Sequence, residues 1–121
     1  MKITVDTAKL KESLKILNDS LKKGYSLFMW FDNALKLRVN DPRFHYVREI
    51  EIEPITLEKD SNDPFLISLD SSQVRELKKS IRYYKQNLTI IEVKENENYE
   101  KHLPRVLRYK LVVNGTEIEV N

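Results

Sequence analysis

The sequence predicts an α+β fold in which a strand, a helix and three further strands are written twice along one domain. Residues Ile3–Glu12 (ITVDTAKLKE) are echoed 64 positions later by Ile67–Glu76 (ISLDSSQVRE), with three identical residues and five conservative exchanges. Each copy opens with a strand-like run that leads into a helix, and three more strand-like runs follow each helix. We therefore expect a pseudo-twofold duplication of a β-α-β-β-β unit, with two helices on one face of antiparallel sheets.

The composition favours one globular domain. The chain has 121 residues, of which 40% are hydrophobic, so it can bury a hydrophobic core without disulfides or metal ions to stabilise it. We expect a single domain, 1–121, with half-repeats of about 1–57 and 65–121 and a polar linker of about 58–64. The absence of cysteine excludes disulfides and thiolate metal sites. We expect no membrane span and no secretory signal, and hence a cytoplasmic protein.

The first half begins with a predicted strand over residues 2–5 and a helix over about 7–23. Asp6 suits the N-cap, because its carboxylate can accept from the free N–H groups of the first turn, and Gly24 suits the C′ position. The apolar stripe of the helix consists of Leu10, Leu14, Leu17 and Leu21, with Val5 as the staple partner of Leu10. Three strands are predicted to follow, over 26–31, 34–40 and about 44–53; Arg48 falls on the apolar side of the last.

The second half repeats this order. A strand over 65–69 leads to Asp70, an N-cap that can form a capping box with Gln73. The helix is predicted over about 71–86, with an apolar stripe of Val74, Leu77, Ile81 and Tyr84. Strands are predicted over 88–93, 105–113 and 116–120, with a charged loop over 95–104. Asn114-Gly115 is the strongest short hairpin signal in the chain.

Basic residues form a stripe on each predicted helix. Because each residue advances about 100°, three lysines of the first helix share one flank of the leucine stripe, and three basic residues of the second helix share the equivalent flank. Most of them coincide in the repeat. We therefore predict the nucleic-acid-binding residues Lys11, Lys15, Lys22, Arg75, Lys79 and Arg82.

The charge is concentrated in the helices. Residues 7–23 hold five lysines and two acids, and residues 71–87 hold five basic residues and one acid. The helical segments therefore sum to +7, whereas the whole chain is +2, so the remainder is −5. Such stripes suit the phosphate backbone of duplex DNA and predict contact that is salt-dependent and independent of base sequence. The alternative is that the helices expose lysines only for solubility.

Three segments resemble one domain of the DNA sliding clamps, above all the bacterial type, the beta subunit of DNA polymerase III. The opening MKITVDTAKLKESLKIL, the middle segment LISLDSSQVRELKKSI and the closing hairpin YKLVVNGTEIEV are each similar to the corresponding part of such a domain. The resemblance covers nearly the whole chain, as a pattern of elements with weak sequence similarity.

The resemblance implies a fold and a function. Clamp rings are built from six such domains, whose helices line a central hole and face DNA, and they tether a polymerase without being enzymes. This chain corresponds to one domain, so a ring would need six copies. We expect a homo-oligomer on double-stranded DNA that contacts a polymerase or another replication protein, as a phage or mobile-element processivity factor would. The alternative is that the chain is one domain of a longer protein.

Motifs for catalysis are absent. With two glycines, Gly24 and Gly115, no glycine-rich phosphate loop can form, and neither Gly-x-Ser-x-Gly nor His-Glu-x-x-His occurs. We expect no enzymatic activity, no cofactor and no metal, and we interpret the alternating acids of residues 49–53 as solvated. Core or sheet positions are expected for Phe28, Trp30, Tyr46 and Tyr109, with an interface anchor as the alternative for Trp30.

A second function fits the same fold. The chain could be an interaction module that does not bind DNA, such as an inhibitor or adaptor of the replication or transcription machinery. The two functions differ in DNA affinity and in oligomeric state.

Overall fold

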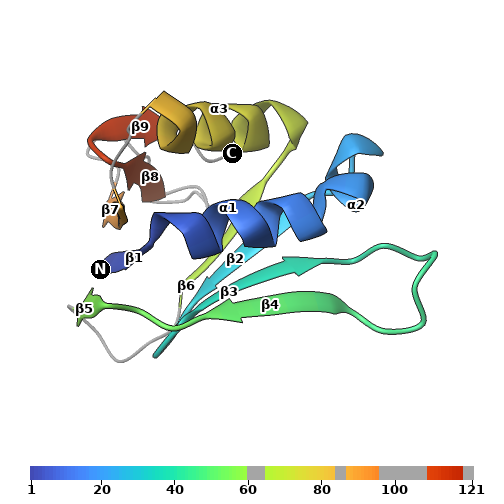
Figure 1. Cartoon of the computed structure of the whole chain (residues 1–121), viewed down its shortest axis with the longest axis horizontal. Helices are drawn as coiled ribbons and strands as arrows, with labels where there is room; N and C mark the ends of the chain where they lie inside the picture. Colours follow the sequence, from blue (N-terminus) through green and yellow to red (C-terminus); the bar gives the residue numbers. More distant parts are fainter. Residues whose placement is uncertain (60–64, 84–86, 96–108, 119–121) are drawn as a thin grey trace, which may run out of the picture.

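The structure, a computed structural model, describes residues 1–59, 65–83, 87–95 and 109–118. It is a mixed α+β fold with two antiparallel sheets and few helices (Figure 1). The elements in chain order are β1 (Lys2–Asp6), α1 (Thr7–Ile16), α2 (Asn18–Lys22), β2 (Leu27–Phe31), β3 (Leu35–Val39), β4 (Arg48–Ile52), β5 (Thr56–Glu58), β6 (Phe65–Leu69), α3 (Ser71–Tyr83), β7 (Leu88–Glu95), β8 (Tyr109–Val113) and β9 (Thr116–Ile118).

Each sheet combines strands that are far apart in the sequence. Sheet A has the order β5-β1-β7-β8-β9, and sheet B has the order β4-β3-β2-β6. The first strand of the chain therefore pairs with β7, with Ile3 opposite Ile91, and β6 pairs with β2, with Ile67 opposite Met29. Both pairings are antiparallel, and neither sheet is complete without both parts of the chain.

Helices α1 and α3 lie side by side and run in opposite directions, as their colours in Figure 1 show. The first helix lies against β1 and β4, and α3 lies against β6, β8 and β9. The outward-facing sides of α1 and α3 therefore lie next to each other on the surface.

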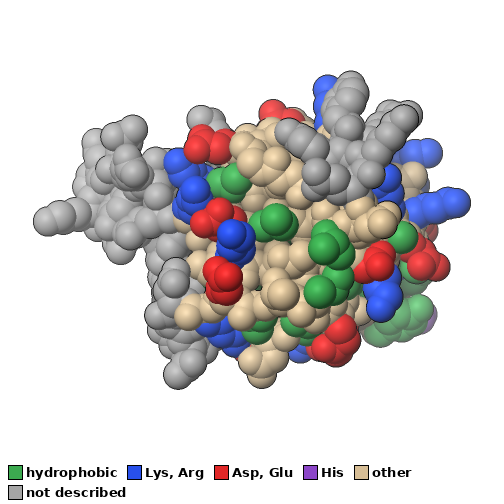
Figure 2. Space-filling model, turned by 60° about the vertical axis from the view of Figure 1, so that its left-hand side comes forward, with side chains coloured by type: hydrophobic (Ala, Val, Ile, Leu, Met, Phe, Trp, Pro, Cys, Tyr) green, Lys and Arg blue, Asp and Glu red, His purple; other side chains and the backbone are tan. Residues whose placement is uncertain are grey.

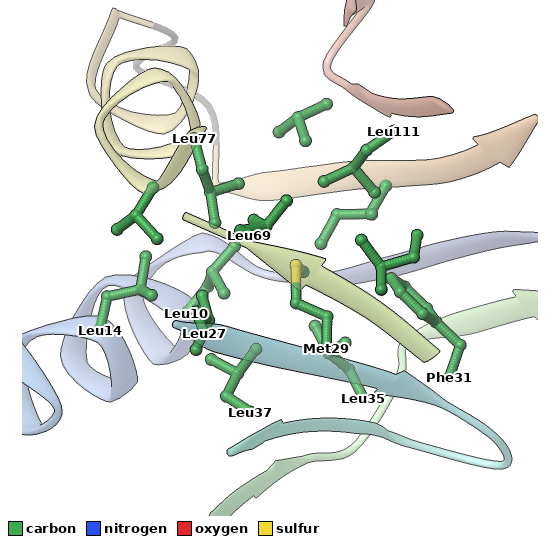
Figure 3. Close-up of a cluster of buried hydrophobic side chains, with 14 of the residues drawn as sticks. Leu10, Leu14, Leu27, Met29, Phe31, Leu35, Leu37, Leu69, Leu77 and Leu111 are labelled. Carbon is green, nitrogen blue, oxygen red and sulfur yellow. The ribbon is translucent and has the colours of Figure 1, made fainter. Parts of the chain in front are cut away.

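One hydrophobic core lies between the sheets and beneath the helices (Figure 3). The predicted leucine stripe of the first helix is buried in it, and so are Val74, Leu77 and Ile81 of α3. In the close-up, side chains of α1, α3 and both sheets point toward one another, among them Leu10, Leu77, Leu69, Met29 and Leu111. Because the apolar stripes are fixed in this core, the neighbouring flanks of both helices are fixed as well.

Both predicted N-caps are confirmed. Asp6 Oδ1 accepts a hydrogen bond from the backbone N–H of Lys9 at 3.1 Å. Asp70 and Gln73 form the reciprocal capping box: Asp70 Oδ1 accepts from the Gln73 N–H at 2.9 Å, and Gln73 Oε1 accepts from the Asp70 N–H at 2.8 Å. The staple residues Val5, Leu10, Leu69 and Val74 are all buried. The repeated segments therefore begin their helices in the same way.

The prediction of one continuous helix over 7–23 is wrong, because the helix breaks at Leu17. In an unbroken α-helix the N–H of Ser20 would bond to the carbonyl of Ile16. Here the Ser20 N–H bonds to Leu17 at 3.1 Å, and Nη2 of Arg48 donates to the Ile16 carbonyl at 2.9 Å. A side chain inserted into the hydrogen-bond ladder breaks the helix at this point. Gly24, at φ +92°, follows α2 as predicted.

The strands differ from the prediction in two places. The third strand begins at Arg48 rather than near Phe44, because Asp41 and Arg43 fold the preceding segment into a turn-rich loop. Tyr46, expected in the core or sheet, lies in that loop and is 70% exposed. The short strand β5 was not predicted, and Glu58, assigned to the linker, is its last residue.

The remaining predicted strands agree with the structure where it describes them. Phe28 and Trp30 are half-buried on β2. The turn between β8 and β9 has positive φ at Asn114 (48°) and Gly115 (83°), as a type I′ turn requires. Several predictions lie outside the described residues: Tyr84 in the helix stripe, the linker from 60 to 64, the loop and strand start over 96–108, and the strand end at 119–120.

Candidate nucleic-acid interface

The predicted DNA-binding residues lie on the helices. Those with described side chains are all exposed, and we call them the basic helical face: Lys11, Lys15, Lys22, Arg75 and Lys79. Arg82 belongs to α3, but its side chain lies outside the described part of the structure. None of these five described side chains is buried in the core, so they are available to a ligand.

A groove lies between α1 and α3 and joins part of this face. Its volume is about 550 Å³. The residues that line it are Lys11, Leu14, Lys15, Asn18, Lys78 and Ile81. Arg75 and Lys79 do not line it, so they lie on α3 outside the groove.

Lys78 is a member of this surface that the sequence prediction missed. Its Nζ donates to Asn18 Oδ1 at 2.8 Å across the groove, and its side chain is only partly exposed. Burial lowers the pKa of Lys78, and the nearby positive charge of Lys22 lowers it further. By helical periodicity Lys78 falls between the apolar and basic stripes, at about 40° from Val74. This position at the boundary is the sequence feature from which the role of Lys78 could have been predicted.

The break at Leu17 changes how Lys22 reaches the surface. The predicted position of Lys22 assumed a continuous helix, whereas Lys22 lies on the separate helix α2. The side chain is still exposed and acts on Lys78 electrostatically. The structure therefore brings Lys11, Lys15, Lys22 and Lys78 together.

Ion pairing divides the basic residues into two groups. Within the described residues, the lysines and Arg75 of the helices form no ion pair. The described cations of strands and loops are paired, apart from Lys2 and Lys23: Lys36 and Arg38 with Glu49, Arg43 with Asp41, Arg48 with Asp19, Lys59 with Asp32, Lys94 with Glu92, and Lys110 with Glu117. The acids Glu12 and Glu76 lie about 100° further round their helices than Lys11 and Arg75. The positive charge of the helices is thus left largely uncompensated.

The side of the molecule that carries sheet A has a different character. Figure 2 brings that side forward and shows basic and acidic side chains next to each other among apolar ones. Leu88 and Ile90 of β7 are exposed there, and Lys94 Nζ lies 3.7 Å from Glu92 Oε2. This side is mixed in charge, in contrast to the helices.

A second groove lies at the loop before β4. Its volume is about 360 Å³, and it is lined by Asn40, Asp41, Pro42, Phe44, His45, Tyr46 and Val47. Tyr46 and Val47 are exposed apolar residues. The loop is held by Asp41, which accepts from the hydroxyl of Ser20 at 2.7 Å and from the guanidinium of Arg43.

The described residues contain no group of three or more His, Cys, Asp or Glu side chains that could hold a metal ion. Glu49, Glu51 and Glu53 of the third predicted strand therefore form no such group. Glu49 Oε2 instead accepts a hydrogen bond from Nη2 of Arg38 at 2.7 Å. Within the same parts of the chain, no helix is long and apolar enough to cross a membrane.

Comparisons with known proteins do not identify this surface. Compared with models of protein families, with curated proteins and with solved structures, the chain gives no match.

Proposed function

We propose that this chain is a sliding-clamp-like protein that contacts duplex DNA, independently of base sequence, through the basic helical face. The observation that carries the proposal is the division of charge: the described helix cations lack ionic partners among the described residues, whereas most of the described cations of the strands and loops have one. A row of unpaired cations on two adjacent helices suits a ligand with regularly spaced negative charges.

The strand orders support the duplicated, clamp-like architecture. If β1 is matched with β6, α1 with α3, and β2–β4 with β7–β9, then sheet B (β6-β2-β3-β4) repeats the order β1-β7-β8-β9 of sheet A. The unmatched strand is β5, which adds to the free edge of β1. The N-caps Asp6 and Asp70 also correspond. We infer an internal pseudo-twofold axis that relates the two helices, and hence their basic flanks.

The chemistry of the face favours backbone contact over base reading. Lysine and arginine that neutralise phosphates fix a protein on DNA without reading its sequence. The surface offers ammonium and guanidinium groups at several positions and no aromatic platform among its described side chains. We therefore expect similar affinities for duplexes of unrelated sequence.

A clamp-like role requires more than one copy of this domain. We propose that the chain acts as a homo-oligomer on DNA and holds a polymerase or another replication protein there, without catalysis of its own. The setting we propose for this role is that of a phage or mobile-element processivity factor.

Titration of fluorescent duplex DNA tests the proposal. We expect the protein to bind random and AT-rich 25-base-pair duplexes alike at low salt. Joint replacement of Lys11, Lys15, Arg75, Lys79 and Arg82 by glutamine should weaken binding by at least about 100-fold, since each lost phosphate contact removes a counterion-release term. A matched variant, Lys36→Gln with Lys94→Gln and Lys110→Gln, should bind like the parent. Equal affinity of the fivefold variant and the parent would refute DNA contact by this face.

A second candidate function rests on the groove beside β4. Exposed Tyr46 and Val47 flank a concave surface next to Phe44, and apolar and aromatic residues of this kind anchor protein partners. An interaction module of the replication or transcription machinery would use this surface. It predicts no DNA affinity, a monomer or dimer by light scattering, and loss of partner capture in the variant Tyr46→Ser.

A further inference from the structure

The groove between α1 and α3 combines an apolar base with a cationic rim. Leu14 and Ile81 contribute the apolar part, and Lys11, Lys15 and Lys78 contribute the charges. Among the described residues, no acidic side chain lines it. Its volume of about 550 Å³ falls within the range of about 300–1,000 Å³ that is typical of ligand sites.

The pairing of Lys78 with Asn18 leaves hydrogen-bond donors in the groove. An ammonium group has only donors, so the amide oxygen of Asn18 must face Lys78, as the 2.8 Å bond has it. The amide nitrogen of Asn18 then has both of its hydrogens available, and it forms no hydrogen bond to another described residue. Nζ of Lys78 has two further hydrogens to donate. Donors from α2 and α3 therefore converge, and no described residue offers an acceptor for them.

The described residues around Lys78 provide no compensating anion. Partial burial and the charge of Lys22 both lower its pKa, so the ammonium form is held at a cost in the free protein. An anion in the groove would oppose both effects, because a nearby negative charge favours the ammonium form. Charge-assisted hydrogen bonds are also roughly twice as strong as neutral ones, and more so away from bulk water.

We propose that the groove seats one backbone phosphate of DNA, bound by Nζ of Lys78 and the amide of Asn18, with Lys11 and Lys15 at its rim. This inference rests on the proposed function and deepens it: the exposed lysines attract DNA, whereas the groove fixes where a strand crosses the two helices. Lys78 is then the strongest single phosphate contact among the described residues.

Neighbouring lysines of α3 provide a matched test. Lys78→Gln and Lys79→Gln remove the same charge from adjacent positions, but only Lys78 lines the groove. For a 25-base-pair duplex at low salt we expect roughly tenfold weaker binding for Lys78→Gln and threefold or less for Lys79→Gln. In isotope-labelled protein, the pKa of Lys78 followed by NMR should rise when the duplex is added.

Asn18→Asp keeps the test valid if Lys78→Gln fails to fold. An aspartate here gives Lys78 an internal carboxylate, so the fold should be at least as stable, while the phosphate is excluded and affinity falls about tenfold or more. Thermal unfolding by circular dichroism checks the first part. An unchanged affinity in Asn18→Asp would overturn the proposal.

The outcomes separate the groove from the wider function. If the parent binds no duplex DNA, the proposed function fails and the groove proposal fails with it. If the parent binds DNA but Lys78→Gln loses no more affinity than Lys79→Gln, DNA contact stands and the phosphate seat is wrong. If polyglutamate binds as tightly as the duplex and Lys78→Gln abolishes that binding, the groove accepts acidic peptides and the phosphate assignment is overturned.

Discussion

Nη2 of Arg48 donates a hydrogen bond to the backbone carbonyl of Ile16, 2.9 Å away, at the last residue of α1. The same guanidinium bonds to Asp19 at 2.6 Å and to the hydroxyl of Ser20 at 2.8 Å, and it lies 4.4 Å from the ring centre of Phe44. One side chain from the start of β4 therefore ends α1 and fixes the short helix α2, which carries Lys22.

Replacement of Arg48 by glutamine should destabilise the protein by about 1–3 kcal/mol, because three hydrogen bonds lose their charged donor. The side chain of Arg48 is only 14% exposed, so water cannot fully replace these bonds. Urea unfolding at pH 7 measures the change. We also expect amide hydrogens of residues 17–22 to exchange faster, since α2 loses its main tether.

Arg38 supplies the control for this prediction. It also pairs with a carboxylate, Glu49, at 2.7 Å, but its side chain is 49% exposed. Exposed ion pairs contribute about 0–1 kcal/mol, so Arg38→Gln should have a small effect. Similar losses in the two variants would contradict the role assigned to Arg48.

Acid should weaken the loop that precedes β4. Hydrogen bonds from Arg43, and then from Ser20, hold the pKa of Asp41 well below its usual range despite its burial. A carboxylate whose pKa is lower in the folded than in the unfolded state stabilises the fold above its unfolded pKa of about 4 and loses that contribution below it. The urea midpoint of the parent should therefore fall between pH 5 and pH 2.

Asp41→Asn isolates the contribution of Asp41, because Asp19 and Asp70 also have lowered pKa values and titrate in the same range. The variant should have a lower urea midpoint than the parent at pH 7, and the difference should shrink toward pH 2. A difference that stays constant with pH would show that the charge of Asp41 is not what matters.

The turn between β8 and β9 should depend on glycine. Gly115 has φ +83°, a conformation that costs other residues about 1–2 kcal/mol, although no atom lies within 4 Å of an added Cβ. Gly115→Ala should lower stability by that amount in thermal unfolding. Thr116→Ala, at an exposed neighbouring position, should change it by less than about 0.5 kcal/mol. Comparable losses in both variants would argue against backbone strain.

Local signals predicted much of the fold. Capping residues, apolar periodicity and Asn114-Gly115 each act over a few residues, so their outcome could be predicted from sequence. The break at Leu17 could not, because its cause is Arg48, 31 positions further along the chain. The short strand β5 was missed for a similar reason: Thr56–Glu58 has weak strand character and is ordered by pairing with β1.

Local sequence signals also predicted only part of the candidate site. Helical periodicity identified Lys11, Lys15, Arg75 and Lys79 because exposure depends on the position around one helix. Lys78 acquires its importance from Asn18 on the other helix, and no pattern within α3 predicts that contact. The sequence also showed where the charges are concentrated, but only the structure shows which of them are paired.

The salt dependence of duplex binding tests the central claim most directly. The logarithm of the binding constant falls with the logarithm of salt concentration by about 0.9 for each neutralised phosphate. If the five cations Lys11, Lys15, Arg75, Lys79 and Arg82 each contact one phosphate, their joint replacement by glutamine should make the slope shallower by about 4–5. An identical slope for the parent and the fivefold variant would contradict a DNA-binding role for the basic helical face.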